Sequence, residues 1–249
     1  MSRENSPAPA SAGPADPALV EDLVAANRVL ADQGVLDGWG HVSVRHNADP
    51  ERFLLSCARA PELVCAADIM EYDLESNPLD ARGRDQYSER FIHGAIYKAR
   101  PDVFAVVHNH APPLIPYGVT GVALRPLYHR AAFIAQGIPI FEIRDCAGMT
   151  DMLIRNNQLG RSLAEVLGNK PAALMRGHGA TVVGPSLPRL VTRSIFLSLN
   201  ATLQSQAMIM AQGGAINYLA PEEARLIEAR EGYGASRAWE AWKRHALQK

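Results

Sequence analysis

The chain has few of the features that mark specialised protein classes. Its 249 residues include three cysteines, Cys57, Cys65 and Cys146, which are widely spaced and form no CxxC pair. This odd and scattered set excludes a disulfide framework and is typical of a reducing cytoplasm. The formal net charge is -1, so we expect no basic surface for nucleic acid or for an anionic membrane. No apolar run approaches the roughly 18 residues that a membrane-spanning helix needs.

What is present is an ordinary globular composition, 47% hydrophobic and 20% charged, which is sufficient for one large core. Residues 1–17 are rich in Pro, Ala and Ser and have little to bury, so they are predicted to form a disordered tail. Residues 18–249 are predicted to form a single domain. The first residues lack the apolar run of a signal peptide, and we expect a cytoplasmic protein.

Hydrophobic spacing predicts helices that alternate with short strands. Helical spacing, with Asp16 and Ser88 as caps, predicts helices over residues 17–33, 88–100, 152–167, 187–212 and 221–229, and a short one over 130–136. Apolar runs predict strands over residues 41–45, 53–56, 66–74, 103–107, 138–141, 172–175 and 181–184. Trp239 and Trp242 lie in the C-terminal tail and need burial, which a neighbouring subunit could provide.

The chemistry of the chain is concentrated in residues 103–113. Five apolar residues predict a buried strand, which a pair of prolines ends. Residues two apart in a strand point to the same side, so His108 and His110 are predicted to leave the strand end together. Two neutral imidazoles on one face can bind one metal ion. The alternative is that both histidines have ordinary structural roles.

Two further motifs offer groups of the same chemical kind. Glu89 and His93 are four apart, which places them on one face near the start of the predicted helix, although a surface Glu and a packing His would show the same spacing. His178 is flanked by Gly177 and Gly179 in a strand–turn–strand pattern, so it can face a cleft. A hairpin histidine without a role is the alternative. Three imidazoles beside a carboxylate would make a catalytic metal site, because structural zinc sites are closed and usually contain cysteine.

These motifs, in this order, resemble those of the class II aldolase/adducin family. The similarity runs from about Leu19 to Ala229 and includes Gly40-His41-Val42-Ser43, Ser88-Glu89 ahead of His93, His108-Asn109-His110 and Gly177-His178-Gly179. The resemblance implies an α/β fold of α/β/α layers, in which a mostly antiparallel sheet is flanked by helices. It also implies a small-molecule substrate and a homotetramer with active sites at the subunit interfaces.

In such proteins the residues that match His108, His110 and His178 hold one divalent metal ion. The residue that matches Glu89 is the acid/base, or a group near the metal that the substrate displaces. Zinc suits this ligand set, and manganese or cobalt would also fit it. The catalytic tyrosine that aldolases lend to a neighbouring subunit aligns with Arg130, and Tyr128 is the candidate to replace it.

The chain departs from the aldolases where they hold a phosphate. It has His41 in place of an asparagine, the stretch Ser56-Cys57-Ala58-Arg59-Ala60 in place of a Thr-Pro-Thr-Gly-like loop, and Tyr87-Ser88 in place of a serine pair. The planar guanidinium of Arg59 suits a carboxylate. The groups expected to bind a substrate that carries carboxylates are His41, Ser43, Arg59, Ser88 and Arg130.

The motifs also look like those of the branch of the family that decarboxylates hydroxylated aromatic or pyridine carboxylates. The predicted activity is therefore a divalent-metal-dependent carbon–carbon lyase of this kind. The first alternative is aldol cleavage, or retro-aldol epimerisation, of a small hydroxy-carbonyl or sugar phosphate. The second is a non-catalytic, adducin-like interaction domain, and the presence of all three histidines and Glu89 argues against it.

Overall fold

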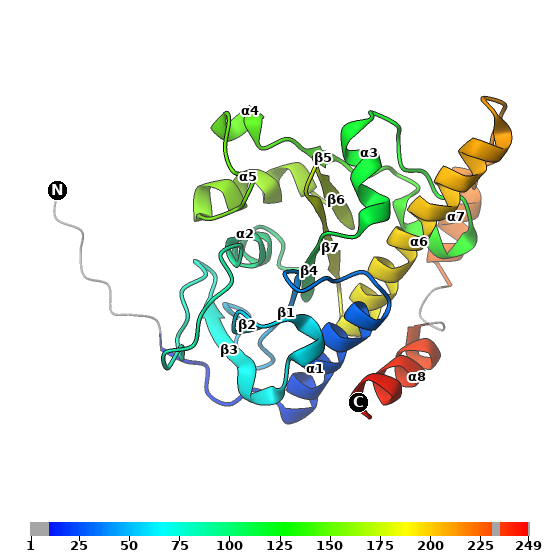
Figure 1. Ribbon diagram of the computed structural model, residues 1–249. Coiled ribbons are helices and arrows are strands. Elements are labelled where there is room, and N and C mark those ends of the chain that lie inside the picture. The colour runs from blue at the N-terminus through cyan, green and yellow to red at the C-terminus, as the bar shows by residue number, and fades with distance from the viewer. Residues whose placement is uncertain (1–9, 231–234, 249) are drawn as a thin grey trace.

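A sheet of seven strands lies between two layers of helices (Figure 1). The computed structural model describes residues 10–230 and 235–248. In these residues the strand order is β3-β2-β1-β4-β7-β6-β5, and every neighbouring pair is antiparallel except β5 with β6. The strands are β1 (His41–Arg45), β2 (Arg52–Ser56), β3 (Ile69–Asp73), β4 (Ala105–Asn109), β5 (Ile140–Phe141), β6 (Ala172–Met175) and β7 (Gly179–Gly184).

Different helices cover the two faces of the sheet (Figure 1). One layer contains α1, α6 and α8, and the other contains α2 and α5, which pack closely against each other. Short 3-10 turns connect several elements. The helices are α1 (Pro17–Asp32), α2 (Phe91–Ala99), α3 (Ile115–Val119), α4 (Arg144–Ala147), α5 (Asn157–Leu167), α6 (Leu187–Ala211), α7 (Pro221–Glu228) and α8 (Ala235–Leu247).

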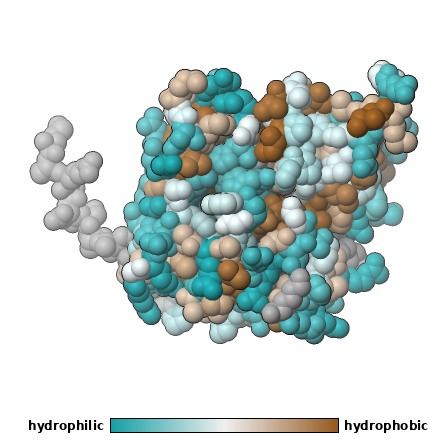
Figure 2. Space-filling model, viewed as in Figure 1, coloured by the Kyte–Doolittle hydropathy of each residue, from teal (hydrophilic) through white to brown (hydrophobic). Residues whose placement is uncertain are grey.

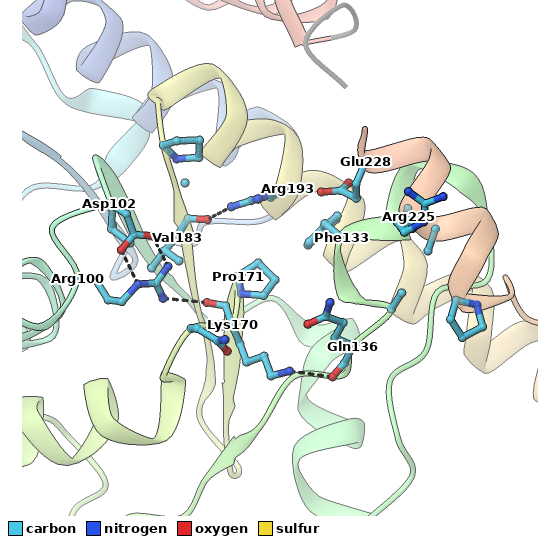
Figure 3. Close-up of a pocket in the computed structure, with 18 of the residues that line it drawn as sticks. Arg100, Asp102, Phe133, Gln136, Lys170, Pro171, Val183, Arg193, Arg225 and Glu228 are labelled. Carbon is cyan, nitrogen blue, oxygen red and sulfur yellow. Dashed lines mark hydrogen bonds and ion pairs between the residues drawn. The ribbon is translucent and has the colours of Figure 1, made fainter. Parts of the chain in front are cut away.

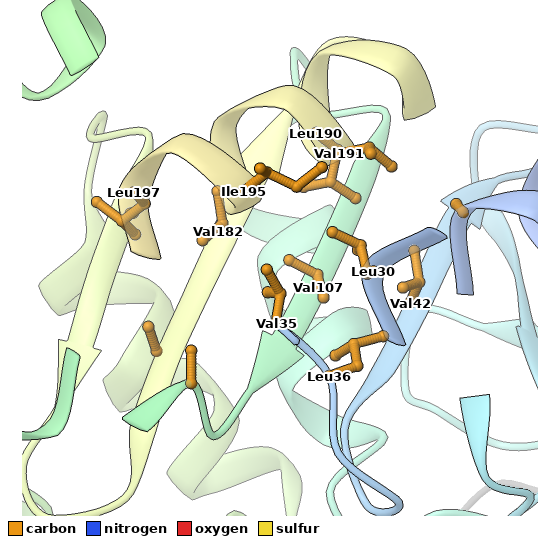
Figure 4. Packing of buried hydrophobic residues seen from close by; sticks show 14 of the residues in the cluster. Leu30, Val35, Leu36, Val42, Val107, Val182, Leu190, Val191, Ile195 and Leu197 are labelled. Atoms are coloured by element: carbon orange, nitrogen blue, oxygen red, sulfur yellow. The ribbon is translucent and has the colours of Figure 1, made fainter. Parts of the chain in front are cut away.

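Strand alternation divides the apolar residues into two cores. Val107 points to the face of α1 and α6, whereas its neighbour Val106 points to the face of α2 and α5. Figure 4 shows the first core, in which Leu30 of α1 and Leu190 of α6 meet Val107 on the central strand β4. Since β4 is covered on both faces, its end is held rigidly in place.

The predicted α/β/α architecture with a mostly antiparallel sheet is confirmed. The predicted start of the second helix is wrong, because α2 begins at Phe91, and Ser88 and Glu89 lie in the preceding turn. Ser88 is exposed and does not cap the helix. The helix expected from Met152 begins only at Asn157. Met152 has a φ of 68°, which a helix does not tolerate, and the side chain of Asn156 provides the cap.

The segment treated as a C-terminal tail contains helix α8, which the sequence analysis missed. Trp239 is 7% exposed and belongs to the first core, and Trp242 packs against that core. Lys243 of α8 forms ion pairs with Glu21 and Asp22 of α1. The burial that the tryptophans require is therefore provided within the same chain.

The first nine residues of the predicted disordered tail, 1–9, lie outside the described residues. Ser11 and Ala12 are held against the sheet, because the side-chain hydroxyl of Ser11 and the backbone N–H of Ala12 donate to the carboxylate of Glu71 on β3. On the face seen in Figure 2, hydrophobic residues occur in small groups among hydrophilic ones. None of the described helices is both long and apolar enough to cross a membrane.

Candidate metal centre

Three histidines and one glutamate meet at the end of the sheet where β4 stops and β7 starts. His108 is fully buried within β4, and His110 follows that strand. The Nε2 atoms of His108 and His110 are 3.0 Å apart, and those of His110 and His178 are 3.2 Å apart. With one carboxylate oxygen of Glu89, the four ligand atoms lie within 4.8 Å of one another. The structure thus brings together four residues from three separate motifs.

The turn between β6 and β7 carries His178, and glycines make this turn possible. Gly177 has a φ of 62°, a conformation that side chains other than glycine rarely adopt. A Cβ atom on Gly179 would lie 2.0 Å from the backbone oxygen of Asn109 on β4. Glycine at position 179 therefore allows the two backbones to approach closely enough for His178 to reach His110.

The second nitrogen of two of these imidazoles is already occupied. Nδ1 of His110 lies 3.0 Å from the carboxylate of Asp37, and Nδ1 of His178 lies 3.2 Å from the backbone oxygen of Met152. Both partners are acceptors, so each Nδ1 carries a proton, and in the neutral ring that binds a metal each Nε2 has a lone pair. Two lone pairs that face each other at 3.2 Å repel unless a cation lies near both. The donor set therefore fits a divalent metal ion, held by imidazoles with fixed outer partners.

Glu89 approaches the histidines from the turn before α2. Its Oε2 is 3.5 Å from Nε2 of both His108 and His178, and its Oε1 accepts a hydrogen bond of 2.9 Å from the backbone N–H of Ile154. Burial alone would raise the pKa of the Glu89 carboxyl, but His108 and His178 outweigh it and hold the pKa well below its usual value. The carboxylate is therefore ionised and can serve as a ligand or as a proton acceptor.

His41 borders this site, whereas Ser43 does not. His41 on β1 is paired in register with His108, and the centroids of the two rings are 5.3 Å apart. The His41 ring also packs on Tyr87, with centroids 4.5 Å apart. Ser43 is fully buried and its hydroxyl contacts His93 and Tyr97 behind His41, so it is not placed to touch a substrate directly.

Two of the residues predicted to bind carboxylates, Arg59 and Ser88, are not bonded to the metal cluster among the described residues. Arg59 forms an ion pair of 3.4 Å with Asp68 and donates to the backbone oxygen of Leu63. Ser88 is exposed beside Glu89. Neither residue is hydrogen-bonded to the histidines or to Glu89 within the described chain, and their roles stay predictions.

Tyr128 and Arg130 lie next to helix α6 and not at the metal centre. Phe196 of α6 contacts the ring of Tyr128, with centroids 6.2 Å apart, and the guanidinium of Arg130 lies 5.9 Å from the same ring. Burial raises the pKa of Tyr128 to about 12, and its buried hydroxyl has no hydrogen-bond partner among the described residues. The structure therefore does not bring these two residues to the cluster of their own chain.

Several supporting groups were missed at the sequence level. Asp37 receives the backbone N–H groups of Trp39 and Gly40, so a short turn fixes the carboxylate that contacts His110. An Asp at the start of a Gly-Trp-Gly turn is a signal for such a loop, but nothing in the sequence pairs it with His110. The backbone groups of Met152 and Ile154 act through an irregular segment that carries no motif.

A separate cleft of about 820 Å³ lies at the other end of β4 and β7, where Val103 and Gly184 line it (Figure 3). Its arginines are largely occupied by neighbouring groups: Arg100 pairs with Asp102, Arg225 with Glu222, and Arg193 donates to the backbone oxygen of Val183. It holds none of the clustered histidines, so the candidate active site is the metal centre.

Comparison with known proteins identifies the family. The model of the family described as Class II Aldolase and Adducin N-terminal domain matches residues 21–205. The chain is 34% identical over 246 residues to decarboxylase tropJ of Talaromyces stipitatus, a match that covers 90% of this chain and 92% of that protein. It is 32% identical to a 3,4-dihydroxyphthalate decarboxylase of a Terrabacter species, with coverage of 89% and 95%.

Solved structures show the same fold at lower sequence identity. An L-fuculose 1-phosphate aldolase from Glaciozyma antarctica superposes with a TM-score of 0.78 over 98% of this chain and 96% of that one, at 21% identity. An aldolase II superfamily protein from Pseudomonas syringae superposes with a TM-score of 0.76 over 93% and 92%, also at 21% identity. The chain therefore belongs to the class II aldolase and adducin family, as a lyase with a candidate metal site formed by Glu89 and three histidines.

Proposed function

We propose that this protein is a divalent-metal-dependent decarboxylase of a small hydroxylated aromatic or heteroaromatic carboxylate. The observation that carries the proposal is the convergence of two bare imidazole nitrogens, from His110 and His178, with His108 and Glu89. Decarboxylases that match about nine-tenths of the chain support loss of CO₂ over aldol cleavage. One of them is named for 3,4-dihydroxyphthalate, which is a hydroxylated aromatic dicarboxylate.

His108, His110 and His178 would hold the metal ion, with Glu89 beside it. We propose zinc as the native ion; manganese and cobalt are the alternatives, because this ligand set does not discriminate strongly among them. When bound, the ion would supply a Lewis acid that stabilises the negative charge developing on the substrate as the carbon–carbon bond breaks.

Residues of the chain itself would accept and donate the proton. Glu89 is ionised, so it can accept the proton of the substrate's ring hydroxyl. Glu89 then delivers this proton to the ring carbon that bears the carboxylate, where the electrons of the ring oxygen form the new C–H bond. The bond between that carbon and the carboxylate breaks, CO₂ leaves, its electron pair restores the aromatic ring, and water reprotonates the ring oxygen as the product leaves. His41, at the wall of the site, would orient the carboxylate that is lost.

We further propose a cytoplasmic homotetramer with active sites at the subunit interfaces. Tyr128 and Arg130 lie next to α6, away from the cluster of their own chain, which supports a contribution to a neighbour's site. The three cysteines are free, as is usual in a reducing compartment. Sedimentation velocity of the purified protein would measure the oligomeric state, and a stable monomer would contradict the shared-site arrangement.

The activity is tested with purified protein loaded with Zn²⁺, Mn²⁺ or Co²⁺. A panel of hydroxybenzoates, hydroxyphthalates and hydroxypyridine carboxylates should release CO₂ in a metal-dependent reaction. His110→Gln should abolish the release, and the matched control His245→Gln, an exposed histidine in α8, should retain it. Aldehyde release from sugar phosphates without any CO₂ from the panel would overturn the proposal, and a protein that binds no stoichiometric metal would favour a scaffold.

A further inference from the structure

A file of four buried polar side chains extends from His41 into the interior. Nδ1 of His41 is 2.6 Å from Nε2 of His93, and Nδ1 of His93 is 2.6 Å from the hydroxyl oxygen of Ser43. The Ser43 hydroxyl lies 2.8 Å from that of Tyr97. At most 1% of each of these side chains, His93, Ser43 and Tyr97, is exposed to solvent. Water therefore does not compete for these hydrogen bonds.

His93 uses both ring nitrogens in this file, which distinguishes it from a histidine that only fills space. Burial lowers the pKa of His93 to about 3, so the ring is neutral and carries a single proton. A neutral ring must then donate through one nitrogen and accept through the other. The direction of every hydrogen bond in the file is therefore linked to the direction of the next one.

The open end of the file fixes this direction. Nε2 of His41 makes no hydrogen bond within the described part of the chain, so it is available to a ligand in the site. A substrate carboxylate is only an acceptor, which requires a proton on that nitrogen. The remaining bonds then follow: His93 donates to Nδ1 of His41, Ser43 donates to His93, and Tyr97 donates to Ser43 at 2.8 Å in preference to the backbone oxygen of Phe104 at 3.4 Å.

We propose that His93 is a positioning residue: held by Ser43 and Tyr97, it fixes the ring and tautomer of His41 so that Nε2–H is directed at the substrate carboxylate. This inference rests on the proposed decarboxylation for the identity of the ligand. The placement of the His41 ring rests on geometry alone. The inference gives His93 a role in substrate affinity, although its side chain touches neither substrate nor metal.

Two substitutions of His93 separate its two hydrogen bonds. In His93→Gln the amide reaches about as far as Nε2 and can still donate to His41, whereas in His93→Asn it reaches about as far as Nδ1 and can contact only Ser43. We expect KM for the best carboxylate substrate to rise about tenfold in His93→Asn, the size of one lost hydrogen bond. In His93→Gln the KM should rise less, and kcat should change little in either variant.

NMR spectroscopy can determine the tautomer of the His41 ring without any catalytic reaction. In Zn²⁺-loaded protein labelled with ¹⁵N-histidine and mixed with benzoate, the His41 ring of the wild type should show one tautomer, protonated at Nε2. His93→Asn should show a mixture. Ser43→Ala, which leaves His93 in place but removes its inner partner, should give the same mixture if the Asn variant does not fold.

His46 provides the matched control. It is 2% exposed, and its ring accepts only from the backbone N–H of Ala48, far from the site along β1. His46→Gln should leave KM and the His41 signals unchanged. The inference is overturned if His93→Asn or Ser43→Ala folds, holds metal and retains both the wild-type KM and the single tautomer. If the wild type releases no CO₂ but shows the predicted tautomer change, the proposed function fails and the positioning role stands.

Discussion

The Nε2 atoms of His110 and His178 face each other at 3.2 Å. Asp37 holds the proton of one ring on Nδ1, and the backbone oxygen of Met152 does the same for the other. Between two neutral rings of this tautomer the contact is repulsive unless a cation lies near both nitrogens. The polypeptide therefore arranges a site whose electrostatic energy improves when a metal ion is present, which links metal binding to the stability of this end of the sheet.

The outer partner of His110 can be tested by Asp37→Asn. The amide keeps the shape of the carboxylate but loses the charge that favours the Nδ1–H tautomer, so the affinity for metal should fall by about 10- to 100-fold. Competition with a chromogenic chelator measures this. Asp145→Asn, a change of the same kind at an exposed position in α4, should leave the affinity unchanged. Equal metal affinities in the two variants would show that Asp37 does not orient His110.

Gly179→Ala should disturb the junction of β4 and β7. The added methyl group would lie 2.0 Å from the backbone oxygen of Asn109, and neither backbone can yield without moving a histidine. We expect a loss of about 1–3 kcal/mol in the free energy of unfolding, together with reduced metal content. Gly38→Ala, where no atom lies within 4 Å of the new Cβ, is the control. Retention of full metal content by Gly179→Ala would contradict this account of the turn.

The buried neutral ring of His93 predicts a pH dependence of stability. Its pKa is about 3 in the folded protein and 6.5 as the ordinary value, so between these pH values the unfolded chain binds a proton that the folded chain does not. The stability that His93 contributes is therefore complete above pH 6.5 and is lost as the pH falls, by up to about 1.4 kcal/mol per pH unit.

His93→Gln removes this proton-binding group. The stability difference between wild type and variant should thus shrink by about 2 kcal/mol between pH 7 and pH 5. Urea unfolding at the two pH values measures it. Parallel pH profiles for the two proteins would mean that His93 is not held neutral by the fold.

Trp239 tests whether α8 belongs to the folded core. The side chain is 7% exposed, and truncation to Ala should reduce the free energy of unfolding by about 3–5 kcal/mol. Trp39 is 76% exposed, so Trp39→Ala should change it by less than about 0.5 kcal/mol. Thermal unfolding followed by circular dichroism compares the two variants. Similar losses would indicate that α8 does not pack as described.

The sequence analysis identified most elements because their apolar periods match the faces that the sheet buries. It placed the start of α2 at Ser88 because a Ser followed by helix-forming residues is a common cap. The structure instead keeps residues 88–90 as a turn, and this turn is what lets Glu89 reach His108 and Ile154. The segment around Met152 departs from its helical pattern for a related reason, since its backbone oxygen contacts His178.

Helix α8 was missed although Trp239, Trp242 and Ala246 recur at helical spacing. Helix α8 packs against α1 and α6, and α1 lies about 200 residues earlier in the chain, so local spacing does not predict that contact. The same limit applies to Arg59, whose ion pair with Asp68 depends on the path of a loop.

Local patterns in the sequence were enough to predict the strands, most of the helices and the three candidate metal-binding histidines. This is because apolar alternation and glycine spacing act over a few residues. Local patterns did not specify which side chains meet in space. The approach of His178 to His110, the selection of Asp37 and Met152 as their proton acceptors, and the stacking of His41, His93, Ser43 and Tyr97 into one file depend on which strands lie side by side. Strand order is set by the burial of both faces of the whole sheet, so these relationships exist only once the chain has folded.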